Sequence, residues 1–352
     1  MIRKAEIQNF KCFKLAKIAN ARRINVIVGE NGVGKTALLE ALFFAAGPSP
    51  EIAIRIQKWR GLQTAFAGPG HLISTVLWQD LFNNFDMKKG ISVSFQGDNH
   101  HNRSLRIFFD DQTPSLLSLK DINESTSVSA RTPRQIVFQW RQGDIDLDPV
   151  MPKIVGDQFQ MDATPPAPFT ASFFSSTYDF SSDENVSRFS AMTIEKRRPR
   201  VTKVVRELFP EIIDLGIELR GGRPVIHADI EHLPQKMPIG SISSGINKMI
   251  SILLALEANS AGILLVDEIE NGLHHSIHGR VWREIYRGAE ESNAQVFTTT
   301  HSLEALQALV DACGDNLEDI GFYQMRRERG VTVIDEADGI TLARGLQLGE
   351  VR

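Results

Sequence analysis

Short apolar runs near the start of the chain predict β-strands. Residues 2–10 and 13–18 read as the two strands of a hairpin, and residues 24–28 form a β-branched run, as in a buried strand. A glycine-rich turn follows, and residues 36–46 have a helical pattern that ends before the Gly-Pro pair at 47–48. Strand, turn and helix in this order predict an α/β fold.

The hydrophobic pattern changes in the middle of the chain. Residues 91–95, 105–109 and 135–140 are short alternating or apolar runs separated by polar turns, which predicts an antiparallel sheet. Residues 115–134 are rich in Ser, Thr and Asp and predict a loop or insertion. Five prolines between residues 148 and 168 predict an irregular connection.

The second half of the chain returns to helices and strands in alternation. Residues 183–209 have helical character. After Gly240 the pattern predicts helix, strand, helix, strand and helix as far as about residue 310, and residues 331–334 predict a late strand. The sequence shows no internal repeat and no sustained heptad pattern, so a long coiled-coil arm is not expected.

Composition and charge limit the possible classes of protein. The chain has 352 residues, 42% of them hydrophobic, which is enough for a sizeable core in one or two domains. The net charge of -4 does not mark a nucleic-acid binder, although a local basic patch is compatible with it. Cys12 and Cys313 suit neither a disulfide framework nor a zinc site, which favours a reducing, cytoplasmic compartment. No apolar run reaches the roughly 18 residues of a membrane span, and no signal peptide is evident, so no membrane association is expected.

The turn after residue 28 matches the full G-x-x-x-x-G-K-T pattern between a predicted strand and a predicted helix. Its residues are Gly29, Glu30, Asn31, Gly32, Val33, Gly34, Lys35 and Thr36. The glycines let successive backbone N–H groups point at phosphate oxygens, and the helix N-terminus adds a partial positive charge. We expect Lys35 to contact the β- and γ-phosphates of ATP and Thr36 to place its hydroxyl on Mg²⁺. The alternative, a chance glycine turn, is disfavoured by the flanking elements.

An unbroken apolar run at residues 263–266 is followed by Asp267 and Glu268. Such a run predicts a buried parallel strand, and ligands of open parallel sheets bind at the C-terminal ends of the strands. We expect Asp267 to hold the Mg²⁺ shell and Glu268 to polarise the attacking water. Asp-Glu after an apolar run is common by itself, and the upstream phosphate-binding pattern makes the catalytic interpretation stronger.

Two further features point to the same phosphates. Ser243, Ser244 and Gly245 form a turn that opens an apolar helix, and its hydroxyl and N–H groups with the helix dipole would make a second anion site. One nucleotide has no obvious use for two such sites in a single chain, whereas a head-to-tail pair of chains does. His301 follows the strand predicted at 295–297 and is placed to sense the γ-phosphate. The plainer alternatives are a simple helix cap and a structural histidine.

A basic stretch lies between residues 188 and 206, where Glu195 is the one acid. Its basic residues are Arg188, Lys196, Arg197, Arg198, Arg200, Lys203 and Arg206. Two interpretations stay open, a solvated helix face or a contact surface for DNA, RNA or an acidic partner.

Together these motifs resemble the heads of the RecF, structural-maintenance-of-chromosomes (SMC) and OLD ATPases, which are of the ABC type. They are most similar to the stand-alone OLD-like AAA-family ATP-binding proteins of bacteria. The similarity covers about residues 1–60 and 185–310 and is weak between them. It rests on residues 7–13, 29–36, 210–213, 243–245, 263–274 and 300–302.

The resemblance implies a P-loop head with a mixed central sheet flanked by helices and an antiparallel β lobe. It also implies a homodimer, or a higher even oligomer, with ATP and Mg²⁺ held between the chains. The residues acting from one chain would be Lys35, Thr36, Asp267, Glu268 and His301. Ser243 and Gly245 would act from the other, with Asn271 and His274 in the D-loop at the interface.

The sequence departs from the family pattern at two positions. The residues after Gly245 are Ile-Asn-Lys, without the usual acid or glutamine. The glutamine that normally couples the lobes to the metal has no clear counterpart. Gln57, Gln79 and Gln139 are weak candidates, and the strand predicted at 169–174 ends in Ser175-Ser176 instead.

The resemblance also sets the expected domain organisation, in which residues 1–352 form one ABC-type head. Residues 1–60 and 216–352 would form the nucleotide-binding core, 61–180 the β lobe or insertion, and 181–215 the basic helical segment.

Many OLD-like proteins carry a fused C-terminal nuclease domain. Only about forty residues follow Val310, and their acidic cluster of Asp335, Glu336 and Asp338 is expected to be a solvated turn. Nuclease or toxin activity is therefore expected from a separate effector chain.

The first functional hypothesis is a switch. ATP binding closes the dimer and hydrolysis opens it, which controls an effector or a DNA contact in antiphage defence or DNA repair. The alternatives are a RecF-like repair ATPase that grips DNA directly and, with less support, an ATPase subunit of a transporter. A small-molecule kinase would leave Ser243 and His301 without a role.

Overall fold

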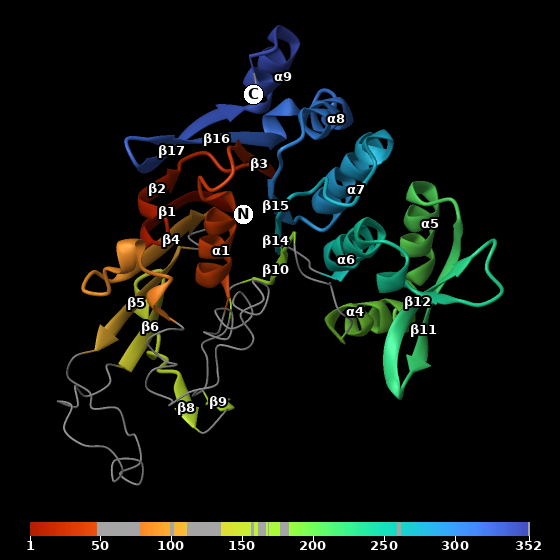
Figure 1. The fold of residues 1–352 in the computed structure, drawn as a ribbon, viewed down its shortest axis with the longest axis horizontal. Coiled ribbons are helices and arrows are strands. Elements are labelled where there is room, and N and C mark those ends of the chain that lie inside the picture. Colours follow the sequence, from red (N-terminus) through yellow and green to blue (C-terminus); the bar gives the residue numbers. More distant parts are fainter. Residues whose placement is uncertain are drawn as a thin grey trace. The chain divides into compact units, whose positions relative to one another are not determined.

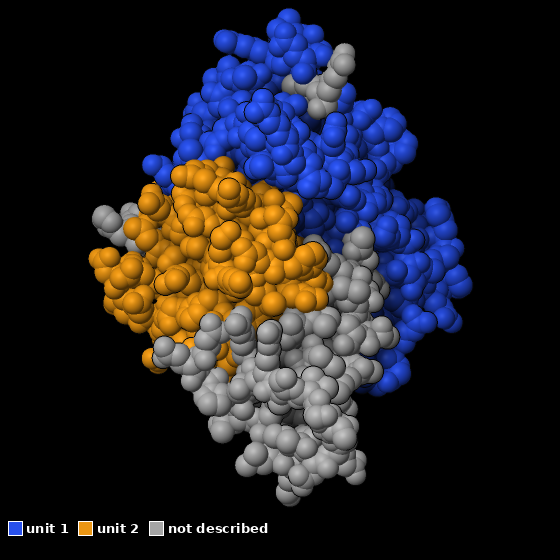
Figure 2. Space-filling model, turned by 60° about the vertical axis from the view of Figure 1, so that its left-hand side comes forward, with its two compact units in different colours: residues 1–4, 18–39, 168–352 blue, residues 5–17, 40–167 orange. Residues whose placement is uncertain are grey.

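The computed structural model describes residues 1–47, 78–98, 102–110, 135–155, 158–160, 167, 169–176, 183–258 and 262–350. The chain divides into two compact units, which Figure 2 shows in blue and orange. Unit 1 comprises residues 1–4, 18–39 and 168–352, and unit 2 comprises residues 5–17 and 40–167. None of the helices formed by the described residues is both long enough and apolar enough to cross a bilayer.

Unit 1 is built on a six-stranded sheet with the order β10-β14-β15-β3-β16-β17. Neighbouring strands from β10 to β16 run parallel, and β17 runs antiparallel to β16, which confirms the mixed sheet predicted from the sequence. All four residues of β14 are buried, as in a strand covered on both faces. The strands are β3 (Ile24–Gly29), β10 (Ala171–Phe174), β14 (Ile263–Val266), β15 (Gln295–Thr299), β16 (Ile320–Glu328) and β17 (Val331–Asp338).

Three helices stand in a row beside this sheet (Figure 1), namely α6 (Ser244–Ala258), α7 (His278–Glu291) and α8 (Leu303–Cys313). Residues 245–256 of α6 are all buried. Trp282 on α7 donates its indole N–H to the carbonyl oxygen of Ala305 on α8 at 2.9 Å, which fixes these two helices together. A last helix, α9 (Gly339–Leu348), packs on β16 and β17. Short 3₁₀ turns occur at η5 (Ile239–Ser241), η6 (His275–Ile277) and η7 (Leu317–Asp319).

Between β10 and α6 the chain forms two helices and a hairpin. These are α4 (Asp183–Ile194), α5 (Arg198–Leu208), β11 (Ile212–Arg220) and β12 (Arg223–Ile230), with β13 (Met237–Pro238) beside β12. The single helical stretch predicted at 183–209 is broken because Lys196 takes a left-handed φ of 61° and Pro199 opens α5. The segment expected as 181–215 belongs to unit 1, since α4 and α5 pack on α6 and on the hairpin.

The acidic cluster expected as a solvated turn is instead part of regular structure. Asp335 and Glu336 lie on β17, where Asp335 pairs with Arg326 and Glu336 accepts from the backbone of Ala19. Asp338 caps α9 by accepting from the Thr341 N–H at 2.8 Å. The prediction was wrong because strand β17 extends to residue 338, beyond the expected 331–334.

Unit 2 contains most of a second six-stranded sheet, of order β2-β1-β4-β5-β6-β7. Strands β4 to β7 pair antiparallel, which confirms the predicted antiparallel sheet. Its described residues also form η2 (Asn83–Phe85) and the ribbon of β8 (Lys153–Val155) and β9 (Gln158–Gln160). The sheet strands are β1 (Ile2–Phe10), β2 (Phe13–Ile18), β4 (Ile91–Gly97), β5 (Arg103–Asp110), β6 (Gln135–Gln142) and β7 (Ile145–Asp146). The loop predicted at 115–134 lies outside the described residues.

A buried arginine fixes the C-terminal end of α1 (Lys35–Ala46), the helix that follows the glycine-rich turn. Arg103 on β5 donates to the carbonyl oxygens of Ala45 at 2.9 Å and Gly47 at 3.3 Å. The last carbonyls of a helix have no partner within the helix and favour a cation. Burial lowers the pKa of the guanidinium to about 10, so the group stays charged at neutral pH.

Candidate functional site

The loop of residues 29–36, the phosphate loop, leaves β3 at Gly29 and enters α1 at Lys35. Gly29, Gly32 and Gly34 have φ angles of 144°, 79° and 108°, which other residue types rarely adopt. A Cβ atom on Gly29 would lie 2.2 Å from the carbonyl oxygen of Met325 on β16, so no larger residue fits there. Residues 30–32 are exposed, which leaves the outer turn of the loop open to a ligand.

Lys35 lies over its own loop. Its Nζ donates to the carbonyl oxygens of Gly29 at 2.7 Å and Glu30 at 2.9 Å. Burial lowers the pKa of this ammonium, while the charges of Asp267 and Glu268 oppose the shift. A cation held only by neutral carbonyl oxygens is well placed to exchange them for the charged oxygens of a phosphate, because charge-assisted hydrogen bonds are stronger.

Asp267 directly follows β14 and receives hydrogen bonds from residues at or after the ends of neighbouring strands. Its carboxylate accepts hydrogen bonds from the hydroxyls of Thr36 at 3.0 Å, Thr299 at 2.7 Å and Ser176 at 3.3 Å. These residues follow or end β3, β15 and β10, whose parallel arrangement places their C-terminal ends at one edge of the sheet. Hydroxyl and carboxylate oxygens are hard donors of the kind that Mg²⁺ prefers, so Thr36 and Asp267 fit a magnesium ion.

Glu268 is half-buried and adopts a left-handed backbone conformation with φ of 48°. Its N–H donates to the Thr299 hydroxyl at 2.7 Å. Its carbonyl oxygen accepts from the N–H of Asn271 at 2.9 Å and from the Nζ of Lys248 at 2.5 Å. Such a conformation in a non-glycine residue persists where the surroundings fix it, and it is concentrated at functional sites.

Residues 243–245, the signature turn, open α6. The Ser243 hydroxyl accepts from the N–H of Ile246 at 3.1 Å, so it caps the helix in addition to any role in anion binding. Ser244 is exposed. A Cβ atom on Gly245 would lie 2.0 Å from the carbonyl oxygen of Gly272, so the signature turn packs directly on the following D-loop (residues 271–274) of its own chain.

His301 is exposed after the end of β15. Its backbone N–H donates to the carboxylate of Glu270 at 2.8 Å. Glu270, which follows Asp267 and Glu268 in the chain, therefore fixes the main chain at His301.

Comparison with known protein families agrees with this arrangement. The sequence profile of the AAA_21 family, described as "AAA domain, putative AbiEii toxin, Type IV TA system", matches residues 24–307, well over half of the chain. The chain belongs to this family.

A known protein and a solved structure are also similar to this chain. An "ATP/GTP phosphatase" of Helicobacter pylori (strain ATCC 700392 / 26695) is 24% identical over 344 residues, which cover 88% of this chain and 87% of that protein. Among solved structures, an Smc head bound to the C-winged helix domain of ScpA is similar over 96% of this chain and 98% of that chain. Its TM-score of 0.52 at 14% identity indicates a shared fold. The chain is thus a P-loop ATPase with the ABC-type fold of an SMC head, and the finer likeness to OLD and RecF proteins stays a prediction.

Beside Asp267, just after the end of β10, lies the hydroxyl of Ser176. Gln139 lies in unit 2, where its side-chain amide donates to the carbonyl oxygen of Leu147. Gln79 also lies in unit 2, and Gln57 lies outside the described residues.

Three residues of the site were not expected from the sequence. The hydroxyl of Thr299 bonds both to the Asp267 carboxylate and to the Glu268 N–H. It belongs to a run of three threonines, and only the register of the strand shows which of the three contacts the acids. Glu270 was recognisable only as a further acid after the predicted pair. Lys248, seen before only as a departure from the signature pattern, is 3% exposed, and burial lowers its pKa to about 8.

The D-loop residues expected at an interface have contacts within the chain. The side-chain amide of Asn271 donates to the carbonyl oxygen of Ser176 at 3.1 Å, which joins the D-loop to the end of β10. His274 bonds through Nδ1 to the hydroxyl of Ser276 at 2.9 Å, and its ring lies 4.2 Å from that of His275. Within the described ranges no three His, Cys, Asp or Glu side chains are grouped as a metal site would require.

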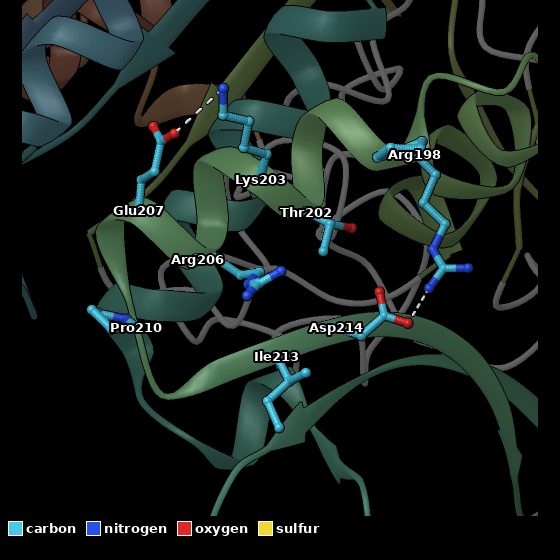
Figure 3. A pocket seen from close by; sticks show the side chains of 9 residues that line it. Arg198, Thr202, Lys203, Arg206, Glu207, Pro210, Ile213 and Asp214 are labelled. Carbon is cyan, nitrogen blue, oxygen red and sulfur yellow. Dashed lines mark hydrogen bonds and ion pairs between the residues drawn. The ribbon is translucent and has the colours of Figure 1, made fainter.

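Most of the basic residues between 188 and 206 have acidic partners. Arg198, Lys203 and Arg206 line a hollow of about 760 Å³ between α5 and β11. Figure 3 shows Arg198 directed at Asp214 and Lys203 at Glu207. Further ion pairs join Arg188 to Glu184, Arg197 to Glu195, and Arg200 to Glu257 and Glu291. This pairing favours the solvated helix face over a nucleic-acid surface, because the cations already have anions beside them.

Proposed function

We propose that two copies of this ATPase hold two ATP molecules between them and separate when the ATP is hydrolysed. In each site one copy supplies the phosphate loop, and the other supplies its signature turn. The observation that carries this proposal is that the signature turn, with Ser244 exposed, packs through Gly245 on the D-loop of its own chain. A helix N-terminus with an exposed hydroxyl is suited to bind an anion, and the nucleotide of a second copy is the phosphate ligand that would use it.

The roles within one site follow from the contacts around Asp267. Lys35 would bind the β- and γ-phosphates in place of its present carbonyl partners, and Thr36 and Asp267 would hold Mg²⁺. When bound, Mg²⁺ neutralises part of the charge that the phosphates carry. Glu268 orients a water molecule and takes its proton as the water oxygen bonds to the γ-phosphorus and the bond to the bridging oxygen of ADP breaks. His301, which is exposed after β15, would bond to the γ-phosphate oxygens.

The biological role that this chemistry supports is a switch. Closure of the dimer by ATP would create or expose a surface for a separate effector, a nuclease or a toxin, in antiphage defence or DNA repair. The alternative, a RecF-like ATPase that grips DNA through residues 188–206, has less support because Arg197, Arg198 and Arg200 are ion-paired within the chain. A transporter subunit has no observation in its favour.

The Glu268→Gln variant tests the proposal. It removes the proton acceptor and keeps the shape of the side chain, so ATP stays intact and the dimer accumulates. Light scattering with ATP and Mg²⁺ should give twice the 39.3 kDa mass of one chain, and with ADP the mass of one chain.

A double variant provides the matched control. Lys35→Ala in the Glu268→Gln chain removes the phosphate contact and should return the mass to that of one chain in ATP. A Glu268→Gln chain that binds ATP and stays at 39.3 kDa contradicts the proposal.

A further inference from the structure

Lys248 is a buried cation that neither the phosphate-binding nor the metal-binding roles use. It opens the second turn of α6, among residues that are otherwise mostly apolar, and is 3% exposed. Its Nζ donates to the backbone carbonyl oxygens of Asp267 at 2.7 Å and Glu268 at 2.5 Å. A buried charge is costly unless hydrogen bonds satisfy it, and an apolar side chain would suit this helix better if packing alone mattered. The position therefore indicates that Lys248 is there for the two carbonyl oxygens to which it donates.

Lys248 fixes the backbone turn at Glu268, the proposed catalytic acid. Glu268 is left-handed, with φ of 48°, and its carbonyl oxygen accepts from Lys248 and from the N–H of Asn271. Its own N–H is bonded to the Thr299 hydroxyl. The direction of the Glu268 side chain depends on this turn, and Lys248 is the contact to the turn that comes from α6.

The other end of the connection is the signature turn. Gly245 lies three residues before Lys248, and the Cβ atom of any larger residue there would meet the carbonyl oxygen of Gly272 at 2.0 Å and Leu273 at 3.0 Å. The start of α6 and the segment 267–273 are therefore joined at two points, one at the acid and one at the D-loop. A rigid connection of this kind transmits small shifts, because packed elements do not deform continuously.

We propose that Lys248 is a positioning residue that ties the backbone of Glu268 to the signature helix of the same chain. This inference rests on the proposed function, in which the signature turn of one copy contacts the ATP bound by the other copy. That contact fixes the position of the signature turn. Lys248 then transmits this position to Glu268 of the same chain, which acts on the ATP of its own phosphate loop. Each ATP site then reaches its full rate only when its chain has also engaged the other ATP. The two hydrolysis events are coupled through α6.

The test compares Lys248→Met with wild type and with Ser251→Ala. Methionine fills a similar volume and has no donor for the two carbonyl oxygens. Ser251 lies one turn further along α6 and bonds to Asn185 and to the Asn247 carbonyl, away from the acids, so its loss damages the same helix without cutting the connection. Three quantities are measured on the full chain: amide hydrogen exchange of residues 267–274 without nucleotide, the Kd for ATP, and kcat.

Lys248→Met should speed exchange of residues 267–274 at least tenfold, leave the Kd for ATP within threefold, and lower kcat about a hundredfold, the size of effect expected when a catalytic group is misplaced by about 1 Å. Ser251→Ala should leave exchange of that segment and kcat within threefold of wild type. Lys248→Arg, which keeps cationic donors, should recover at least tenfold in kcat over Lys248→Met.

Unchanged exchange of residues 267–274, or a kcat within threefold of wild type, overturns the proposal. So does an equal loss of ATP affinity and kcat in Lys248→Met and Ser251→Ala, which would mean general damage to α6. If Lys248→Met does not fold, Lys248→Gln replaces it, because its shorter amide cannot reach both carbonyl oxygens. The exchange measurement needs neither ATP nor a dimer, so failure of the two-copy model and failure of the Lys248 connection are separately visible.

Discussion

Thr299→Val removes a single oxygen from the centre of the site. Thr299 is fully buried at the end of β15, and its hydroxyl donates to Asp267 at 2.7 Å and accepts from the Glu268 N–H at 2.7 Å. Valine has nearly the same shape, so the substitution breaks both hydrogen bonds with little change in packing. The Glu268 N–H is left without this acceptor in its strained left-handed turn.

The expected cost follows from these two bonds. A hydrogen bond to a charged group contributes about 1.5–3 kcal/mol, and a buried donor left unpaired costs about 1–3 kcal/mol. The two effects share one hydroxyl and do not add fully, so we expect the free energy of unfolding of unit 1 to fall by about 3 kcal/mol. For a unit of this size the corresponding drop in Tm is about 6–12 °C. We also expect kcat to fall at least tenfold, because Glu268 loses one of its backbone anchors.

Differential scanning calorimetry with a phosphate-release assay measures both effects. Thr299→Ser is the matched control, because it keeps the hydroxyl and loses only a methyl group, at a cost of about 1 kcal/mol. If Thr299→Val is as stable and as active as Thr299→Ser, the hydroxyl does not hold the two acids and the reasoning is wrong.

Three further substitutions have defined outcomes. Gly245→Ala places a methyl group 2.0 Å from the Gly272 carbonyl oxygen and should lower kcat at least tenfold in a phosphate-release assay. Ser176→Ala removes a hydroxyl beside the proposed metal site and should raise the Mg²⁺ concentration for half-maximal activity about tenfold; an unchanged Mg²⁺ titration would remove Ser176 from the metal shell. Reversing Arg198 and Arg200 to Glu breaks surface ion pairs, should cost less than about 1 kcal/mol each, and should leave any DNA retention on a filter unchanged. Loss of ATP-dependent DNA retention in that variant would restore the nucleic-acid interpretation.

The strands of unit 1 that are buried on both faces were predictable from the sequence. Strand β14 is an unbroken apolar run, and β3 is apolar up to Val28 apart from the buried Asn25. Each ends at a recognisable motif, the phosphate loop or the acidic pair. Strand β16, between β3 and β17, was missed because only its first half is buried and its end reads Arg-Arg-Glu. The hairpin of β11 and β12 was missed for the same reason, since its outer half is exposed and polar around Gly221 and Gly222.

The supporting contacts of the site depend on pairings between distant parts of the chain, which no local pattern encodes. Lys248 looks like an ordinary helix lysine until α6 packs against the end of β14. Ser176 reaches Asp267 only because β10 pairs in parallel with β14. The sequence left two interpretations of the basic stretch open because Glu257 and Glu291, the partners of Arg200, are far away in the sequence.

The most direct measurement of the central claim mixes two inactive variants. Glu268→Gln keeps its signature turn and lacks the acid, and Ser243→Arg keeps the acid and has a blocked signature turn. If ATP is held between the phosphate loop of one copy and the signature turn of another, each variant alone is inactive. An equal mixture should then recover measurable activity, up to about a quarter of the wild-type value, because half of the randomly formed pairs carry one intact site out of two. The value falls below a quarter to the extent that the blocked signature turn slows the intact acid of the same chain through Lys248. Full activity of Ser243→Arg alone, or no recovery at any mixing ratio of the two folded variants, would contradict the claim.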